Sequence, residues 1–566
     1  MSVTAIVFVI VFVSTAMVVL FFTRFRAKVA LRARLIDLPG KMPDLDEHGQ
    51  AVSLENLDSI TRYAKRMEAH DPGAWRLDAT TWNDLDMNKV FGRVNVCLSS
   101  VGEEYLYNCL HELQQDESGL LAREDLVQYL SANPEERLAV QMALYRLGKQ
   151  NYNGLIRLMF ATDKRFLKYQ WLYRVMAWLP LLGTVLFFVH VPIAFFVVFG
   201  GFVANFIIDD RVQDKTEDEI PAIDYMNRLL RCCGRLAKHN CTLPIFATVR
   251  QGYKQLKPMM NRMPSGRVTN NEWMDLSFIL DYVRILFLIK VRNYNRVMRM
   301  IEEQTDALHG LFKAVGELEV ALCVQSLRLN LPVACVPTFV PDAQIEFDGM
   351  VHPLITQPVA NTAEISGNTL LTGSNASGKS TFIKALALGS VLAQTLYTCA
   401  AERFALRFSW VMTSMVMRDD LSGGDSYFIV EIKSLKRMID RVKLYPCTCF
   451  VDEILRGTNT VERIAASASV LRWLHGQDDD QAQPNCLVLA ATHDIELTQL
   501  LADAYANYHF RETVEASGVT FDYKLQPGPA TTRNAIKLLE VMDFNPRIVT
   551  QAQDMSQRYD TTQKWM

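Results

Sequence analysis

Two long apolar stretches stand out in the hydrophobic pattern of this 566-residue chain. The first, residues 3–22, contains no charged residue, and its length is that of a helix crossing a bilayer. Basic residues follow it closely, namely Arg24, Arg26, Lys28, Arg32 and Arg34. Because basic residues favour the cytoplasmic side, the pattern predicts a membrane span with its N-terminus outside. A cleaved signal peptide is the alternative, although its positive charge would precede the apolar run.

The second apolar stretch, residues 171–208, is too long for one span and predicts a helical hairpin. Its turn is expected at His190-Val191-Pro192, since proline disfavours helix in the residue before it. Basic residues flank both ends and are absent from the turn, so both ends are predicted to be cytoplasmic. We expect close packing of the two arms at Gly183, Gly200 and Gly201. The alternative is a buried hairpin within a soluble helical core.

Most of the remaining N-terminal half has the spacing of helices. Residues 82–174 and 220–331 are predicted to be helical, with apolar positions such as Leu276, Ile279, Leu280 and Val283 recurring on one face. After residue 336 the pattern changes to short apolar runs that alternate with helical stretches, which is typical of an α/β domain.

A phosphate-binding loop is the clearest chemical motif of this second half. Residues 372–381 read Thr-Gly-Ser-Asn-Ala-Ser-Gly-Lys-Ser-Thr between a short apolar strand and an alanine-rich helix. Glycines let successive N–H groups surround a phosphate, and the helix N-terminus adds a favourable dipole. Lys379 is expected to reach the phosphates and Ser380 to bind Mg²⁺. The predicted ATP-binding residues are Gly373, Ser374, Asn375, Ala376, Ser377, Gly378, Lys379, Ser380 and Thr381.

Two later apolar runs end in polar residues suited to hydrolysis. One ends at Asp452-Glu453, where Asp452 would hold Mg²⁺ and Glu453 would activate the attacking water. The other ends at His493, which is predicted to contact the γ-phosphate because ligands collect at the carboxyl ends of parallel strands. We therefore predict Glu453 and His493 as catalytic residues, and Ser380 and Asp452 as Mg²⁺ ligands.

A second Gly/Ser-rich turn lies between these motifs. It precedes a predicted helix at 429–442 and is a potential anion-binding turn. Since one phosphate loop binds one nucleotide, we expect this turn to cap the nucleotide of a second copy of the chain. The predicted trans-acting residues are Ser422, Gly423, Gly424 and Ser426.

Together these motifs resemble the MutS family of ATPases. The resemblance is carried by residues 372–381, 419–431, 452–460 and 491–498, and most specifically by Asp-Glu-x-x-Arg-Gly-Thr-x-Thr at 452–460. It is strong over 344–553 and weaker over 95–113 and 220–331, which resemble the family's helical core and lever. By this resemblance Ser426 reaches the nucleotide of the partner subunit, His493 is a switch histidine and the chain is a homodimer.

The chain also departs from the family pattern. Ser374, Ala376 and Ser377 give a phosphate loop closer to that of ABC-type ATPases, and Val359 stands where an aromatic residue often stacks on adenine. No Gly-x-Phe-x-Glu motif, which reads mismatches in the family, occurs near the N-terminus, and we see no room for the domain that carries it.

Composition adds few constraints. The net charge is −3, which gives no general basic signature for nucleic acid. The 11 cysteines show no metal-site spacing and are interpreted as reduced, mostly buried thiols.

The predicted fold is an α/β P-loop NTPase domain of ABC/MutS type that follows an all-α core and lever, with transmembrane helices. The predicted segments are a transmembrane helix at 1–23, a cytoplasmic linker or helical segment at 24–80, the first part of the helical core at 81–170, a transmembrane hairpin at 171–208, the second part of the core and lever at 209–335 and the ATPase domain at 336–566.

The predicted function is that of a membrane-anchored, MutS-like ATPase that uses ATP and Mg²⁺ in a homodimer, in a multi-pass arrangement in the inner or plasma membrane with its ATPase domain in the cytoplasm. Its partners are expected to be the lipid bilayer and a protein that the sequence does not identify, and DNA binding stays open. One alternative is a DNA mismatch repair or recombination factor, and a second is an ABC-type transporter ATPase. The short interval between Lys379 and Asp452 argues against the transporter, because it leaves little room for that family's helical subdomain.

Overall fold

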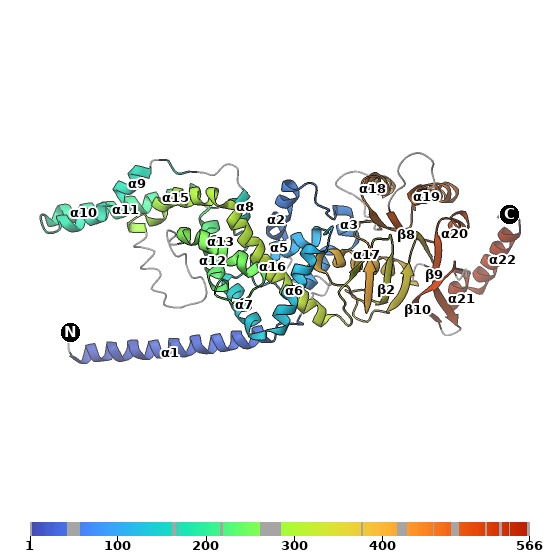
Figure 1. Ribbon diagram of the computed structural model, residues 1–566, viewed down its shortest axis with the longest axis horizontal. Helices are drawn as coiled ribbons and strands as arrows, with labels where there is room; N and C mark the ends of the chain where they lie inside the picture. Colours follow the sequence, from blue (N-terminus) through green and yellow to red (C-terminus); the bar gives the residue numbers. More distant parts are fainter. Residues whose placement is uncertain are drawn as a thin grey trace.

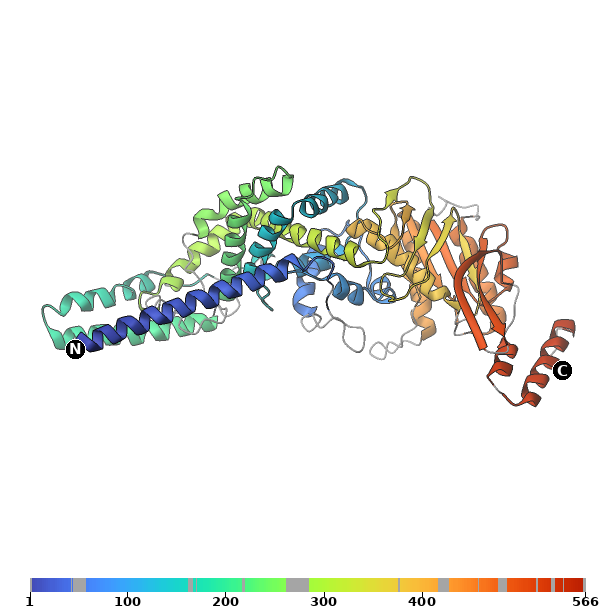
Figure 2. The ribbon, with the colours of Figure 1, turned by 90° about the horizontal axis from the view of Figure 1, so that it is seen from below.

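The computed structural model of the chain is elongated, with helices at one end and two β-sheets towards the other (Figures 1 and 2). The structure describes residues 3–41, 43, 57–160, 166–168, 170–215, 219–260, 285–374, 377–415, 427–456, 458–476, 486–515, 518–530, 535–542 and 544–562.

Helix α1 (Val3–Ile36) is longer than the predicted span and continues through the basic residues that follow it. At 34 residues it is about 51 Å long. Its C-terminal end contacts the helical core, where Leu35 is buried and Arg32 forms an ion pair with Glu135. The rest of α1 extends away from the C-terminal domain, towards the same end of the molecule as helices α10 and α11 (Figures 1 and 2).

The apolar hairpin has two unequal arms. Its first arm consists of α9 (Gln170–Met176) and α10 (Leu179–Leu186), and its second arm is the single helix α11 (Val191–Lys215). The chain turns at residues 187–190, so of the predicted turn residues only His190 lies in the turn, and Val191 begins α11. Pro192 lies in the first turn of α11, where its missing N–H costs nothing. The break in the first arm was not predicted. Pro180 explains it, because a helix continuing from α9 would need the N–H that this proline lacks.

Close packing of the hairpin depends on two of the three predicted glycines. A Cβ at Gly183 would lie 2.4 Å from Cγ2 of Val198, and one at Gly201 would lie 3.2 Å from Cβ of Leu179. Gly200 has no such contact within 4 Å, so its predicted packing role is wrong.

Among the described residues, one stretch is long and apolar enough to cross a membrane, Val191–Val212, and 17% of it is buried. The alternative of a buried hairpin is therefore wrong for this arm. The other two predicted spans are not identified in the same way. The first hairpin arm is interrupted, and most side chains of residues 3–22 lie outside the described part of the chain.

The helical core surrounds the central helix α16 (Thr305–Asn330), most of whose side chains are buried. Its other helices are α2 (Leu57–His70), α3 (Ala79–Asp84), α4 (Met87–Val94), α5 (Ser100–His111), α6 (Ser118–Ala132), α7 (Pro134–Leu147), α8 (Leu155–Phe160), α12 (Glu219–Leu236), α13 (Pro244–Met260) and α15 (Ile289–Glu303). Helix α5 begins at Ser99, whose hydroxyl accepts a hydrogen bond from the backbone N–H of Gly102. Helix α15 lies within the predicted helical stretch 220–331, whereas Leu276, Ile279, Leu280 and Val283 lie outside the described part.

The C-terminal domain is built on a six-stranded sheet with the order β10-β9-β4-β8-β7-β6. Strands β4 (Thr369–Thr372), β6 (Trp410–Ser414), β7 (Cys447–Asp452), β8 (Cys486–Thr492) and β9 (Ala506–Glu515) are parallel, and β10 (Gly518–Pro527) pairs antiparallel with β9. The central strands β4, β7 and β8 are buried along almost their whole length, as expected for a parallel sheet covered by helices on both faces. The prediction of an α/β domain is thus confirmed.

Further elements complete this domain. The helices are α17 (Lys379–Leu396), α18 (Tyr427–Val442), α19 (Thr460–His475), α20 (Glu496–Leu500), α21 (Ala535–Val541) and α22 (Pro546–Thr562). A second sheet has the order β1-β5-β2-β3 and contains β1 (Thr338–Phe339), β2 (Ile345–Met350), β3 (Asn361–Ile365) and β5 (Arg403–Leu406). Helix α22 lies at the end of the molecule opposite to α10 (Figures 1 and 2).

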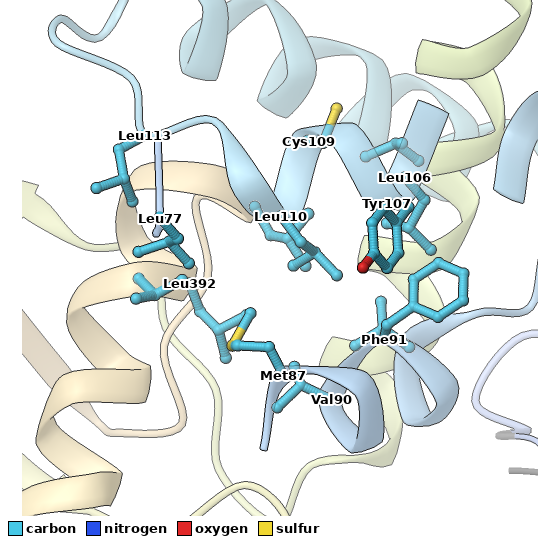
Figure 3. Close-up of a cluster of buried hydrophobic side chains, with 14 of the residues drawn as sticks. Leu77, Met87, Val90, Phe91, Leu106, Tyr107, Cys109, Leu110, Leu113 and Leu392 are labelled. Atoms are coloured by element: carbon cyan, nitrogen blue, oxygen red, sulfur yellow. The ribbon is translucent and has the colours of Figure 1, made fainter. Parts of the chain in front are cut away.

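A continuous hydrophobic core runs through the helical core and the C-terminal domain. At the junction, Leu392 of α17 lies near Leu77, and Leu110 of α5 and Met87 of α4 belong to the same cluster (Figure 3). The helix that follows the phosphate loop is therefore packed directly against the helical core.

Candidate nucleotide-binding site

The phosphate loop lies between β4 and α17, as the sequence predicted. Gly378 precedes α17 with a φ of 97°, and Gly373 leaves β4 with a φ of 143°, both in the region that favours glycine. A Cβ at Gly373 would lie 2.9 Å from the carbonyl oxygen of Phe510. The Ser377 hydroxyl donates to the carbonyl of Ser374 at 2.7 Å, which closes the loop on itself.

Lys379 is almost fully buried at the start of α17. Its Nζ donates to the carbonyl oxygens of Gly373 and Ser374 at 2.6 and 2.7 Å, and lies 3.5 Å from Nε2 of His493. Burial lowers the pKa of Lys379 to about 8, against the opposing attraction of Asp452 and Glu453. The ammonium group thus lies inside the loop, at the place where a phosphate would be surrounded by N–H groups.

Strand register brings the other predicted residues to the same sheet edge. Thr372 at the end of β4 lies opposite Thr492 of β8, and Ala491 of β8 lies opposite Asp452 of β7. Because these strands are parallel neighbours, their carboxyl ends deliver Lys379, His493 and Glu453 to one place. His493 Nε2 lies 2.6 Å from a carboxylate oxygen of Glu453, which confirms their predicted proximity.

Glu453 is held in a strained turn. Its φ is 56° and that of Leu455 is 59°, which are unusual values for residues with side chains. Its carboxylate also forms an ion pair with Arg456. Burial alone would raise the pKa of Glu453, but the hydrogen bond with His493 and the charges of His493, Arg456 and Lys379 lower it overall. The group is therefore ionised at neutral pH.

Oxygen atoms suitable for Mg²⁺ are present at the predicted positions. Asp452 is buried, and its Oδ1 has no hydrogen-bond partner within the described part of the chain. Ser380, in the first turn of α17, is exposed. A carboxylate and a hydroxyl are the hard oxygen ligands that Mg²⁺ prefers. The residues present therefore fit this ion.

Six predicted site residues belong to segments that the structure does not describe. Asn375 and Ala376 of the phosphate loop lie outside the described residues, as do Ser422, Gly423, Gly424 and Ser426 of the second turn. Thr381 is described and is exposed on α17. Val359 is 38% exposed, in the segment before β3.

Two acidic residues that sequence reasoning did not select also support the site. Glu431 of α18 accepts a hydrogen bond from the backbone N–H of Leu455, and burial raises the pKa of its carboxyl. Glu512 of β9 accepts a hydrogen bond from the hydroxyl of Ser374. Glu431 lies within 419–431, one of the segments that carry the family resemblance, so the sequence offered a reason to select it. No motif in the sequence indicated a role for Glu512.

A phosphate loop at the edge of a parallel sheet, next to a buried Asp-Glu pair, defines a P-loop nucleotide-hydrolase domain. The family model described as MutS domain V matches residues 369–560. The chain is 30% identical over 277 residues to the DNA mismatch repair protein MutS of Natronomonas pharaonis, which covers 47% of this chain and 31% of that protein. It is 27% identical over 324 residues to the protein of the same name from Thermus aquaticus, which covers 56% of this chain and 38% of that protein.

The C-terminal part of the chain is therefore similar to domain V of the MutS family. The chain spans about a third of the length of the curated relatives that it matches. The transporter alternative finds no support in these relatives.

Proposed function

We propose that this chain is an ATP hydrolase whose active site is completed by a second copy of the same chain. The observation that carries the proposal is the convergence of Lys379, His493 and Glu453 at one sheet edge, with 2.6 Å between His493 and Glu453 and 3.5 Å between His493 and Lys379. Phosphoryl transfer depends mainly on positioning and on charge stabilisation, and this cluster supplies both.

Each residue has a distinct role in this proposal. Lys379 exchanges its two carbonyl partners for phosphate oxygens and neutralises their charge. Glu453, ionised at neutral pH, accepts the proton of the attacking water. His493 contacts both residues. It therefore orients Glu453 and couples this orientation to phosphate binding at Lys379. Mg²⁺ held by Ser380 and Asp452 would neutralise further charge on the phosphates.

Two copies are proposed because the second Gly/Ser-rich turn follows a strand at the sheet's far edge. Strand β6, which leads into this turn, is separated from the phosphate-loop strand β4 by β7 and β8. The resemblance to the MutS family supports a partner's Ser426 as the group that completes each site. The dimer would close when ATP binds and open after hydrolysis.

We further propose that α1 and the hairpin of α9 to α11 anchor the protein in a membrane, with the ATPase domain in the cytoplasm. The hairpin exposes large apolar side chains, including Phe188 at 88%, Val189 at 78% and Phe196 at 74%. An apolar surface of this kind is typical of contact with lipid or a partner protein. The proposed anchor rests on these side chains and on the flanking basic residues.

The second candidate function is DNA mismatch repair. The relatives' names favour it over a role at the membrane, since each of those compared above is a DNA mismatch repair protein. The two candidates share the ATPase chemistry and differ in what the helical core acts on.

Glu453→Gln tests the shared chemistry. We expect this variant to keep wild-type affinity for ATP and to lose about 10²- to 10⁴-fold in kcat, because the amide cannot take the proton from water. ATP binding is measured by equilibrium titration and hydrolysis by phosphate release. Wild-type turnover in this variant would remove Glu453 as the base.

Binding to duplex DNA and resistance to carbonate extraction distinguish the two candidate functions. A DNA-repair role predicts binding to duplex DNA that weakens steeply with salt, since phosphate contacts release counterions. A membrane role predicts that the protein stays with membranes during alkaline carbonate extraction and that its ATPase rate ignores added DNA. Extraction into the soluble fraction would exclude the anchor.

A further inference from the structure

At one edge of the six-stranded sheet, a strand contacts the helical core through hydrogen bonds that have no role in the proposed chemistry. Strand β6 is the last strand of the sheet, and it ends at Ser414, just before the predicted trans-acting turn. An edge strand presents unpaired backbone groups that need partners. Here those partners come from α3, a short helix of the helical core more than 300 residues earlier in the chain.

Two side chains of α3 satisfy the edge of β6. The N–H of Thr413 donates to the Thr81 hydroxyl at 3.2 Å, and the N–H of Met415 donates to Oδ2 of Asp84 at 3.0 Å. The same Asp84 oxygen accepts a hydrogen bond from the Thr413 hydroxyl at 2.7 Å. Asp84, Thr81 and Thr413 are all buried, so water does not compete for these contacts.

The far side of the turn is attached to the same place. Arg437 of α18 donates to the Thr413 carbonyl at 2.5 Å and forms an ion pair with Asp78, the residue that caps the N-terminus of α3. Asp78, Asp84 and Arg437 thus tie the chain just before the turn and the helix just after it to one small helix. We name Asp78, Thr81, Asp84 and Arg437 the α3 clamp.

We infer that the α3 clamp positions the trans-acting turn for the neighbouring subunit's nucleotide, with Asp84 as the central positioning residue. The inference rests on the proposed two-copy site. It assigns a mechanical role to α3: a displacement of the helical core relative to the sheet would move both flanks of the turn together. Since a misplacement of about 1 Å can cost 10²-fold in rate, the clamp would connect the helical core to hydrolysis in the partner.

Mixed dimers of full-length chains test this inference, because a defect of the turn acts only on the partner's site. Asp84→Ala removes the acceptor and should lower kcat by about 10- to 100-fold, with ATP affinity unchanged. Asp84→Asn keeps an oxygen acceptor and should retain most of the rate. Heterodimers are made by co-expressing Asp84→Ala and Lys379→Ala chains with different tags and are isolated in detergent by both tags.

The expected result is that the Lys379→Ala homodimer is inactive, that the Asp84→Ala homodimer keeps about 1–10% of the wild-type rate, and that the heterodimer has about half of the wild-type rate. One of its two sites then combines an intact phosphate loop with an intact turn. An inactive heterodimer would overturn the inference, as would a fully active Asp84→Ala homodimer.

Two further variants keep the result interpretable. Arg437→Met should behave like Asp84→Ala, and it replaces Asp84→Ala if that chain does not fold. Glu124→Ala is the matched control, because Glu124 is a buried carboxylate that also joins the helical core to the ATPase domain, through Arg328. It should hydrolyse ATP at the wild-type rate, and an equal loss of kcat there would overturn the assignment of the effect to the clamp.

The pair of Ser426→Ala and Lys379→Ala tests the two-copy site itself. If this pair regains activity on mixing and the Asp84→Ala pair does not, the clamp inference alone fails. If neither pair regains activity, the shared site fails as well.

Discussion

Lys379 occupies a position in which its charge depends on the pH. Its ammonium group has two carbonyl acceptors and a histidine nearby, but the side chain is almost fully buried. Burial outweighs the attraction of the nearby carboxylates and lowers its pKa to about 8. In the free protein, therefore, the charge that would bind phosphate is lost within the range of ordinary buffers.

This lowered pKa predicts a pH dependence of ATP binding. Below about pH 8 Lys379 is protonated and affinity should be constant with respect to this group. Above it, binding requires the uptake of a proton, so affinity should fall by up to about tenfold per pH unit. The measurement is equilibrium binding of ATP from about pH 7 to about pH 9.5, where the lysine of an unfolded chain would stay mostly charged.

Lys379→Ala serves as the control for this measurement. Its weaker binding should show no fall above about pH 8, because the titrating group is gone. Constant wild-type affinity across this range would contradict a buried Lys379 with a lowered pKa.

At the scale of elements, the ends of the buried strands were predicted well from the sequence. The residues that stabilise the site through contacts from other elements were not predicted. The strand ending in Asp452-Glu453 and the strand ending at His493 were predicted because buried strands have a continuous apolar pattern. Glu431 and Glu512 act through contacts across 24 and 138 residues, which no local pattern encodes. The break in the hairpin's first arm was encoded by Pro180 but was hidden by the apolar composition around it.

The start of α17 gives a prediction about one backbone position. Gly378 has a φ of 97°, and a Cβ there would lie 2.9 Å from Cδ1 of Tyr523. Gly378→Ala should therefore destabilise the protein by about 1–3 kcal/mol, chiefly through the left-handed backbone, since the Tyr523 side chain can move aside. Thermal unfolding followed by tryptophan fluorescence measures this loss.

Gly367 provides a matched comparison for Gly378, because it precedes β4, the strand that leads into the phosphate loop. It has open space for a Cβ and does not have a left-handed φ. Gly367→Ala should leave the unfolding temperature unchanged. Equal unfolding temperatures for the two alanine variants would show that the conformation of Gly378 is not required for stability.

At the scale of the whole molecule, the apolar helices and the nucleotide site lie in different regions of an elongated chain, with the helical core between them (Figures 1 and 2). The hydrophobic core continues from the central helix α16 to the P-loop helix α17, so the two regions are joined by packed side chains. Motion at the nucleotide site therefore has a physical route to the helical core, through α17 and the α3 clamp.

This arrangement gives a prediction about which side of a membrane each end occupies. If the hairpin spans a bilayer and the basic residues stay in the cytoplasm, the turn before Val191 faces outwards. Val189→Cys, at a residue 78% exposed in this turn, should react with a membrane-impermeant maleimide in intact cells. Leu444→Cys, 72% exposed in the ATPase domain, should react only after lysis.

The native cysteines give little background in this experiment, because nine of the eleven are buried and the other two are partly buried. Labelling of the two introduced cysteines to the same extent in intact cells would contradict the proposed orientation. Protection of both until lysis would place the hairpin tip on the same side as the ATPase domain, and the apolar side chains of α11 would then need a protein partner in place of lipid.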